Sequence, residues 1–221
     1  MKIKSTIFAG LASMAIGLPA VQAAVLDFDG AGICTSDASG MGAASNCNNS
    51  AYILQSYGDV AGVVDVSYAA PRYNDGRSLR WWADDYNNLH GVLWADGSDA
   101  NSLARIDLTP GSGQSVTLTH LDLGAWVNTT RNTTLTISDL NGNLLYSYKG
   151  PVGDGSTSMP TSFNGSWSSA SGIRIEWEDS AYNVGVDNIT YNMAPVPEPE
   201  SYAMLVIGLA ALGALARRRR A

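Results

Sequence analysis

The sequence has little histidine, little cysteine and few charged residues, and each shortage argues against a class of function. The two histidines, His90 and His120, are far apart and have no metal-ligand spacing, so a zinc site is not expected. No Gly-x-Ser-x-Gly segment occurs, so the chain lacks this setting for a nucleophilic serine. Charged residues make up 15% of the chain, and acidic residues outnumber basic ones by 20 to 13, which argues against a nucleic acid partner. We therefore expect a protein that is not an enzyme.

Long apolar segments are confined to the two ends of the chain, and the first has the pattern of an export signal. Lys2 and Lys4 precede an apolar segment over residues 7–18. Val21-Gln22-Ala23 follows as a cleavage site with small residues. We predict that signal peptidase cuts after Ala23, so that residues 1–23 take no part in the fold and the chain crosses the inner membrane.

The second apolar segment belongs to a tail with three parts. Residues 195–201 form a stiff spacer rich in proline and glutamate, because proline fixes φ and restricts the residue before it. Residues 202–216 carry no charge, and four arginines follow directly. As an α-helix the uncharged part is about 22 Å long, against about 30 Å of membrane hydrocarbon, so it spans only marginally. The arginines are expected to stay in the cytoplasm, which places the preceding chain on the far side of the membrane.

This order of segments resembles the PEP-CTERM sorting signal of bacteria that make exopolysaccharide. Besides the short apolar helix within residues 202–221, the resemblance rests on Val196, Pro197, Glu198, Pro199, Arg217, Arg218, Arg219 and Arg220. It implies that a membrane protease-transpeptidase of the exosortase type cuts the tail near its Pro-Glu-Pro segment and discards it. The protein would then contact the inner membrane transiently and end at the cell surface or in the extracellular matrix. A permanent single-span anchor is the alternative.

One domain, residues 24–194, lies between these two segments. Loss of both ends removes Lys2, Lys4 and Arg217–Arg220, so Lys+Arg falls from 13 to 7. It also removes Glu198 and Glu200, so Asp+Glu falls from 20 to 18 and the net charge of the domain is −11 with histidine neutral. Such an acidic surface favours solubility and is compatible with divalent cations.

Cys34 and Cys47 both lie in the exported part of the chain. An even pair of cysteines there predicts a disulfide that closes a loop rich in small polar residues. In the chain-entropy model a loop of this size is worth about 3 kcal/mol. A metal or redox pair is the alternative, but these cysteines have no CxxC spacing and no nearby histidine.

Short segments of alternating apolar and polar residues fill the domain, with turn residues between them. The alternation is clear in residues 103–108, 116–123 and 173–178. A bulge is expected near His120, because the apolar side of its segment changes there. Asn141-Gly142 predicts a hairpin with a type I′ turn. About ten such strands predict an all-β fold: an antiparallel β-sandwich or jelly roll of galactose-binding-like type.

The predicted strands are also similar to the jelly-roll domains common in PEP-CTERM proteins, whose last strand has a Val/Ile-Asp-Asn-Ile pattern. Val186-Asp187-Asn188-Ile189 matches that pattern, which supports the fold more than a function. Jelly rolls often join their ends through an ion. Asp27, Asp29, Asp187 and Asn188 are candidate ligands for a structural calcium, since hard oxygen atoms favour that ion. The alternative is that these residues only form turns.

Trp81 and Trp82 suggest a carbohydrate site. Successive side chains of a strand point to opposite faces, so one of the two rings is expected to be exposed, near Tyr86. The alternative is that a loop or the other sheet covers this face as well. Glu176 and Glu178 raise a third hypothesis, a glycan hydrolase, but their alternation with apolar residues is typical of a solvent-facing side of a sheet.

The sequence therefore predicts an exported, non-enzymatic protein of the cell surface or extracellular matrix, associated with exopolysaccharide or biofilm and sorted through its C-terminal signal. A carbohydrate-binding module that recognises exopolysaccharide is the alternative, and a glycan-active hydrolase is less favoured. Signal peptidase and an exosortase are the expected partners.

Overall fold

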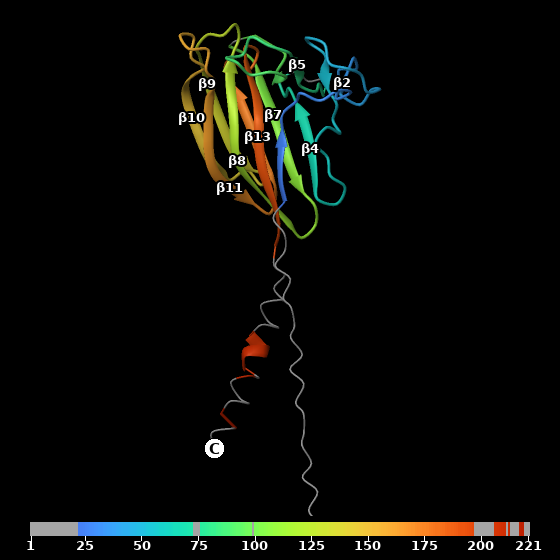
Figure 1. Cartoon of the computed structure of the whole chain (residues 1–221), viewed down its shortest axis with the longest axis vertical. Helices are drawn as coiled ribbons and strands as arrows, with labels where there is room; N and C mark the ends of the chain where they lie inside the picture. Colours follow the sequence, from blue (N-terminus) through green and yellow to red (C-terminus); the bar gives the residue numbers. More distant parts are fainter. Residues whose placement is uncertain are drawn as a thin grey trace, which may run out of the picture.

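The computed structural model describes residues 22–72, 76–98, 100–196, 206–210, 212 and 217–218. Its strands form a sandwich of two sheets (Figure 1). The strands are β1 (Gln22–Leu26), β2 (Cys34–Thr35), β3 (Tyr52–Ile53), β4 (Val64–Ala69), β5 (Arg80–Trp82), β6 (Val92–Trp94), β7 (Leu103–Pro110), β8 (Gln114–Ala125), β9 (Arg131–Asp139), β10 (Leu144–Val152), β11 (Thr161–Ser169), β12 (Ile173–Glu178) and β13 (Val184–Pro195). Residues 206–210 are helical.

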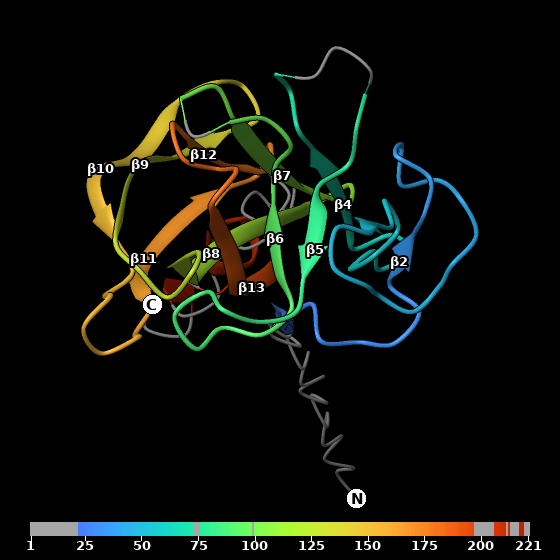
Figure 2. The same ribbon diagram turned by 90° about the horizontal axis from the view of Figure 1, so that it is seen from above.

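Both sheets are antiparallel. The larger has the order β11-β8-β13-β6-β5-β3-β2, with β1 also paired to β13, and the smaller has the order β10-β9-β12-β7-β4. Figure 2 looks onto the end of the sandwich, where the row β9, β12, β7 lies opposite the row β8, β13, β6. The prediction of an all-β antiparallel sandwich is confirmed.

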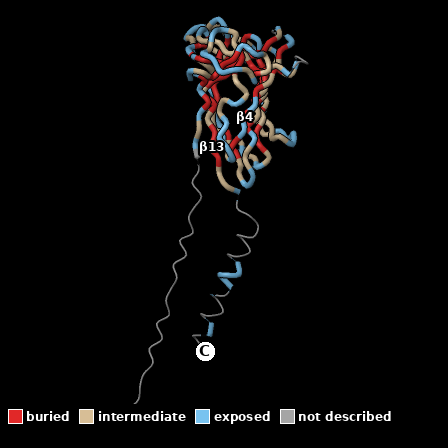
Figure 3. Tube along the Cα trace, turned by 90° about the vertical axis from the view of Figure 1, so that its right-hand side faces the viewer, coloured by how far each residue is buried: buried red, intermediate tan, exposed pale blue. Residues whose placement is uncertain are grey.

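The core lies between the two sheets, where the buried residues concentrate (Figure 3). In β12 the side chains of Ile173, Ile175 and Trp177 are fully buried, and the residues between them face outward as the alternation predicts. Each large apolar side chain buried in this way contributes about 1.5–3 kcal/mol. Trp177 also donates a hydrogen bond of 2.9 Å from Nε1 to the carbonyl oxygen of Val184, which ties β12 to the start of β13.

The predicted bulge near His120 is present. The register of β13 against β8 shifts where Thr190 faces His120. In β8 the buried residues change from Val116 and Leu118 to Leu121 and Leu123, so the inward side changes parity across the bulge. The shift leaves His120 and the residue two further on, Asp122, on the outer side of the larger sheet.

The hairpin between β9 and β10 is present, but the predicted type I′ turn is wrong. Only Gly142 has a positive φ, whereas a type I′ turn needs two such residues. The amide of Gly142 donates to the carbonyl of Asp139, and the amide of Asp139 donates to the carbonyl of Asn143, which gives a three-residue loop. The Asp139 carboxylate accepts hydrogen bonds from the amides of Asn141 and Asn143. The Asn143 side-chain amide also donates to this carboxylate, at 2.7 Å. This bond and then the backbone bonds lower the pKa of Asp139, and together they stabilise the longer turn.

A disulfide joins Cys34 and Cys47, whose Cα atoms are 5.0 Å apart, as predicted. Cys34 is buried in β2 and faces Ile53 of β3. Since β2 is the last strand of the larger sheet, the disulfide fastens the N-terminal loop to that edge.

The strands nearest the two ends of the chain, β1 and β13, lie side by side (Figure 1). In their register Gln22 faces Met193. β1 begins at Gln22, two residues before the predicted start of the domain. Gln22 and Ala23, which we expected to lie outside the fold, are therefore paired with β13 in the full-length chain. Cleavage after Ala23 stays a prediction. At the other end the amide of Val196 donates to the carbonyl of Gly113, so pairing continues into the first residues of the tail.

No helix in the described part of the chain is long and apolar enough to cross a membrane. The described residues therefore give no support to the predicted transmembrane helix over residues 202–221. Most of that segment lies outside the described residues, as do Pro197, Glu198, Pro199, Arg219 and Arg220. Arg217 and Arg218 are described, and both are helical and exposed.

Replacement of Cys34 and Cys47 by serine is expected to lower the free energy of unfolding by about 3 kcal/mol, because the unfolded chain regains the entropy of an open loop. For a domain of this size the Tm should fall by about 6–12 °C. Thermal unfolding followed by circular dichroism measures this change. Wild-type protein in a reducing agent should match the double variant. An unchanged Tm in both samples would contradict the prediction.

Candidate functional site

The outer face of the larger sheet is partly covered by the loop of residues 83–91. Two glycines permit this close approach: a Cβ on Gly124 would clash with the carbonyl oxygen of Tyr86, and a Cβ on Gly185 would lie 2.7 Å from Val92. Tyr86 and Val92 are buried together with Leu89, and Trp82 packs against them. The loop and the sheet thus form a second, small apolar cluster outside the main core.

Asn87 anchors this loop through its side chain, which is fully buried. Its Oδ1 accepts a hydrogen bond of 2.6 Å from the amide of Ala125. Its Nδ2 donates to the carbonyl oxygens of Thr129 at 3.2 Å and Asp154 at 3.3 Å. Four segments of the chain are therefore joined at one side chain, next to Trp126.

Aromatic rings from several segments line a pocket beside this loop. The lining residues are Trp82, Tyr86, Trp94, Trp126, Tyr182 and Asn183. They come from the ends of β5 and β6, from the loop between them, from the residue after β8, and from the residues before β13. The volume of the pocket is about 70 Å³. Three parts of the chain that are distant in sequence, residues 82–94, residue 126 and residues 182–183, thus form one aromatic site.

Neighbouring rings in the pocket stand nearly perpendicular to one another. Trp82 lies 6.4 Å from Trp94 at 72° and 6.2 Å from Trp126 at 75°, measured between ring centroids. Tyr182 lies 5.3 Å from Trp94 at 88°. Such edge-to-face contacts are the favoured geometry of aromatic pairs. Tyr86 is 2% exposed and closes the inner side, whereas Trp126 and Tyr182 are 36% and 40% exposed at the rim.

Arg80 supports the pocket from the adjacent part of the sheet. Its guanidinium carbon lies 4.3 Å from the ring centroid of Tyr52 and 5.8 Å from that of Trp94. Asp96 binds Arg80 at 2.5 Å and Arg77 at 3.0 Å. Trp94 Nε1 is buried without a hydrogen-bond partner in the described part of the molecule. The Trp94 ring is therefore held by packing and by the cation beside it.

The two adjacent tryptophans have separate roles, and the prediction that one is exposed is only partly right. Trp81 packs against the main core, and its Nε1 donates a hydrogen bond of 2.9 Å to the carbonyl oxygen of Phe28. Trp82 points to the outer face and lines the pocket, where it is half-buried. Tyr86 also lines the pocket, but it is buried at its floor instead of exposed. Burial raises the pKa of Tyr86 well above its usual range, so this floor is uncharged.

The sequence interpretation missed Trp94, Trp126, Tyr182 and Asn183. Trp94 ends a short apolar segment that predicts a buried strand, and no local pattern links it to Trp126 or Tyr182. Trp126 directly follows β8 and Tyr182 lies just before β13, and the end of one strand and the start of its antiparallel partner lie at the same edge, so these two positions were the available signal.

The residues predicted to hold calcium lie near one another. Asp27 and Asp29 are close enough to Asp187 to affect its pKa, and Asp122, which was not among the predicted ligands, faces Asp187 across β8 and β13. Burial raises the pKa of Asp187 to about 8; a hydrogen bond from the amide of Asn188 opposes this shift, while Asp29, Asp122 and Asp27 add to it. In the described residues, however, no group of three or more His, Cys, Asp or Glu side chains is arranged to hold a metal ion. Calcium binding stays a prediction.

Asn188 and His120 both contact Asp122 on this outer face. Asn188 Nδ2 donates to Asp122 Oδ2 at 3.0 Å, and His120 Nε2 lies 3.3 Å from Asp122 Oδ1. Ser162 Oγ also donates to Asp122 Oδ1. Ser162 thus contacts the carboxylate directly, whereas in a catalytic triad the histidine lies between the serine and the carboxylate, so the group lacks that order.

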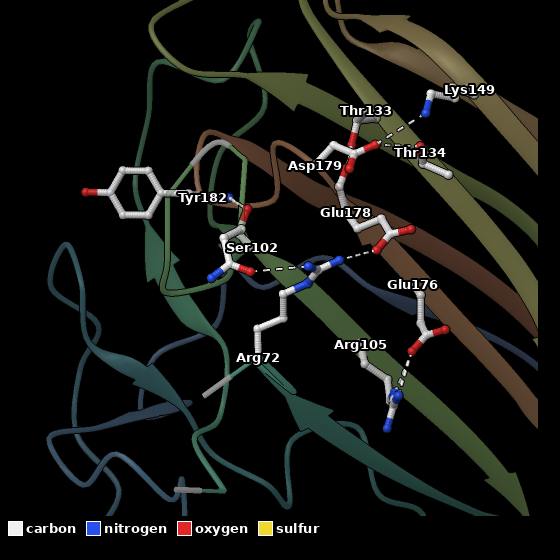
Figure 4. Close-up of polar contacts among 11 residues, drawn as sticks. Arg72, Ser102, Arg105, Thr133, Thr134, Lys149, Glu176, Glu178, Asp179 and Tyr182 are labelled. Carbon is white, nitrogen blue, oxygen red and sulfur yellow. Dashed lines mark hydrogen bonds and ion pairs between the residues drawn. The ribbon is translucent and has the colours of Figure 1, made fainter. Parts of the chain in front are cut away.

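Glu176 and Glu178 lie on the outer face of the smaller sheet (Figure 4). Arg105 Nε donates to Glu176 at 2.8 Å, and Arg72 Nη2 lies 2.5 Å from Glu178. Each carboxylate therefore has its own arginine, and the pair gives no support to the hydrolase hypothesis. The Tyr182 ring points away from both carboxylates (Figure 4).

At the C-terminal end, residues 195–220 match the family model of the PEP-CTERM protein-sorting motif. The chain carries a PEP-CTERM protein-sorting motif. The match confirms the resemblance drawn from the Val196–Pro199 segment and the arginines. The sorting motif marks the chain as an exported protein sorted to the cell surface and implies processing by an exosortase.

No curated protein matches the sequence of this chain. Among solved structures, one titled "CBM4 structure and function" is 12% identical with a TM-score of 0.30, over 60% of this chain and 84% of that chain. A Podospora anserina GH26-CBM35 β-(1,4)-mannanase is 16% identical with a TM-score of 0.33, over 62% and 29%. An exo-β-1,3-galactanase from Phanerochaete chrysosporium is 15% identical with a TM-score of 0.33, over 72% and 36%. No conclusion about ligand or activity follows from likenesses this distant.

The stability of the domain is expected to fall as the pH rises from about 4 to about 8. The folded state keeps a proton on Asp187, whose pKa is raised to about 8, while the unfolded state releases it near 3.8. This contribution is complete below about pH 4 and lost above about pH 8. Asp187→Asn should reduce the difference in Tm between pH 5 and pH 8 by several degrees. Thermal unfolding in a pH series measures it.

Asp139→Asn is the matched control for this prediction. The pKa of Asp139 is lowered from 3.8, so this group does not titrate between pH 5 and pH 8 and its variant should keep the wild-type slope. If Asp187→Asn also keeps that slope, Asp187 does not hold its proton in the folded state.

Proposed function

We propose that this chain is an exported, non-enzymatic carbohydrate-binding protein of the cell surface or extracellular matrix, with exopolysaccharide as its ligand. The observation that carries the proposal is the aromatic pocket, in which five rings from distant segments meet. A sorting motif at the C-terminal end fits this role, because it directs the domain to the surface where exopolysaccharide lies.

A sugar ring suits this pocket because its C–H faces are apolar while its hydroxyl groups are polar. Trp126 and Tyr182 expose ring surface at the rim, on which a C–H face packs. Each Å² of apolar surface removed from water contributes about 25 cal/mol. The Tyr182 hydroxyl and the Asn183 amide supply polar groups beside these rings. The six lining residues are tryptophan, tyrosine and asparagine, with no acidic or basic side chain among them, which favours a neutral ligand.

The position of the pocket also supports this role. Tyr182 lies just before β13, and Pro195, where the sorting motif begins, is the last residue of the same strand. A strand of 12 residues at about 3.3 Å per residue is about 36 Å long. A domain held at its C-terminal end therefore carries the pocket at the opposite end of the sandwich, where a polymer reaches it.

Trp126→Ala and Tyr182→Ala are each expected to weaken binding to exopolysaccharide from the native host at least tenfold, because each removes a ring at the rim. Affinity electrophoresis in gels that contain the polymer measures the change. Trp167→Ala is the matched control: this half-buried ring on β11 lies outside the pocket, and binding should not change. Thermal unfolding checks that all three variants fold. Wild-type protein that does not bind, or rim variants that bind normally, would contradict the proposal.

Sorting is tested by the intact mass of the protein from cells and medium of the native host. We expect a mass that begins at Ala24 and ends within residues 195–200, with or without an added group, because the exosortase removes the rest. A mass that still includes residues 202–221 would show a permanent anchor instead of a processed tail.

A further inference from the structure

The rings of the pocket do not share a plane, so they do not form a platform along which a glycan chain runs. The interior of a chain binds through several successive sugar rings and needs aromatic faces aligned along a path that is open at both ends. Trp82 instead stands at 72° to Trp94 and at 75° to Trp126. Tyr182 stands at 88° to Trp94. The rings therefore form the walls of a hollow.

The size of the hollow limits its occupant further. Neighbouring ring centroids are 5.3 to 6.4 Å apart, so adjacent rings touch and leave no gap between them through which a chain could pass. The volume of about 70 Å³ is small beside the roughly 300–1,000 Å³ of pockets that enclose larger ligands. The hollow therefore admits no more than one sugar residue, and two linked residues do not enter it together.

The inner side of the hollow is closed. Tyr86 and Asn183 line it and are 2% and 8% exposed. The amide of Trp126 donates a hydrogen bond of 2.9 Å to the carbonyl of Asn183, and Asn87 binds the amide of Ala125. These bonds join the segments that flank the pocket. A chain that enters from the rim therefore has no exit on the far side.

From this geometry we propose that the pocket binds the terminal sugar residue of a glycan chain or branch, and not the interior of the chain. The inference rests on the proposed carbohydrate-binding function and names the part of the polymer that is recognised. The affinity then depends on one sugar residue of the glycan. The number of binding sites on a polymer equals its number of accessible chain ends.

The test uses mature protein recovered from the native host and exopolysaccharide of that host, intact and partially hydrolysed by acid. Mono-, di- and tetrasaccharide fractions of the hydrolysate are titrated by calorimetry. We expect the Kd values of the three fractions to agree within about threefold, because sugar residues beyond the terminal one make no contact with the protein. At equal polymer mass, hydrolysis should raise the number of binding sites in proportion to the chain ends that it creates.

The outcomes separate the two proposals. An affinity that rises tenfold or more from mono- to tetrasaccharide, or a number of sites that hydrolysis leaves unchanged, overturns recognition of chain ends while carbohydrate binding stands. Absence of binding to the intact polymer and to every fraction overturns the proposed function, and this inference with it.

A variant locates the effect in the pocket. Trp82→Ala removes the ring shared by two of the perpendicular pairs and should weaken binding of all fractions by the same factor, at least tenfold, whereas Trp167→Ala should bind as wild type. If Trp82→Ala binds every fraction normally, the end-binding site is elsewhere. The saccharide series on wild-type protein decides the proposal even if this variant fails to fold.

Discussion

The register of β13 is the constraint on which the rest of the structure depends. This strand pairs with β8 over almost its whole length, and its other edge pairs first with β6 and then with β1. Its beginning follows the aromatic pocket, its middle carries Asp187, and its end leads into the sorting motif. A shift of one residue would move its apolar side chains to the solvent face, so the register that buries them also fixes the other three features.

The same strand joins the two ends of the domain. β1 is the first strand of the chain and finds its partner in β13, the last one. Contacts between residues so distant in sequence form late in folding, because closing a long loop costs entropy before the contact stabilises it. The strand nearest the predicted export signal thus depends for its partner on the strand nearest the sorting motif.

The outer face of the larger sheet is divided between two environments. At one end a loop packs closely over Gly124 and Gly185 and contributes the floor of the aromatic pocket. Beyond it, Asp122 and Asp187 lie side by side with little solvent around Asp187, which is 4% exposed. An aromatic pocket and a pair of nearly buried aspartates therefore lie on the same face of one sheet.

The sequence by itself determined the features that depend on local pattern. The alternation in β12, the bulge near His120, the pairing of Cys34 with Cys47 and the sorting motif all follow from short segments, because strand faces, cleavage signals and a single cysteine pair need no distant partner. Tertiary structure decided which tryptophan faces outward and which distant rings join it. Trp82, Trp94, Trp126 and Tyr182 lie on separate strand ends, and only the pairing order of β5, β6, β13 and β8 brings them together. The turn at Asp139 and the burial of Asp187 likewise depend on hydrogen bonds and neighbours that the local pattern does not specify.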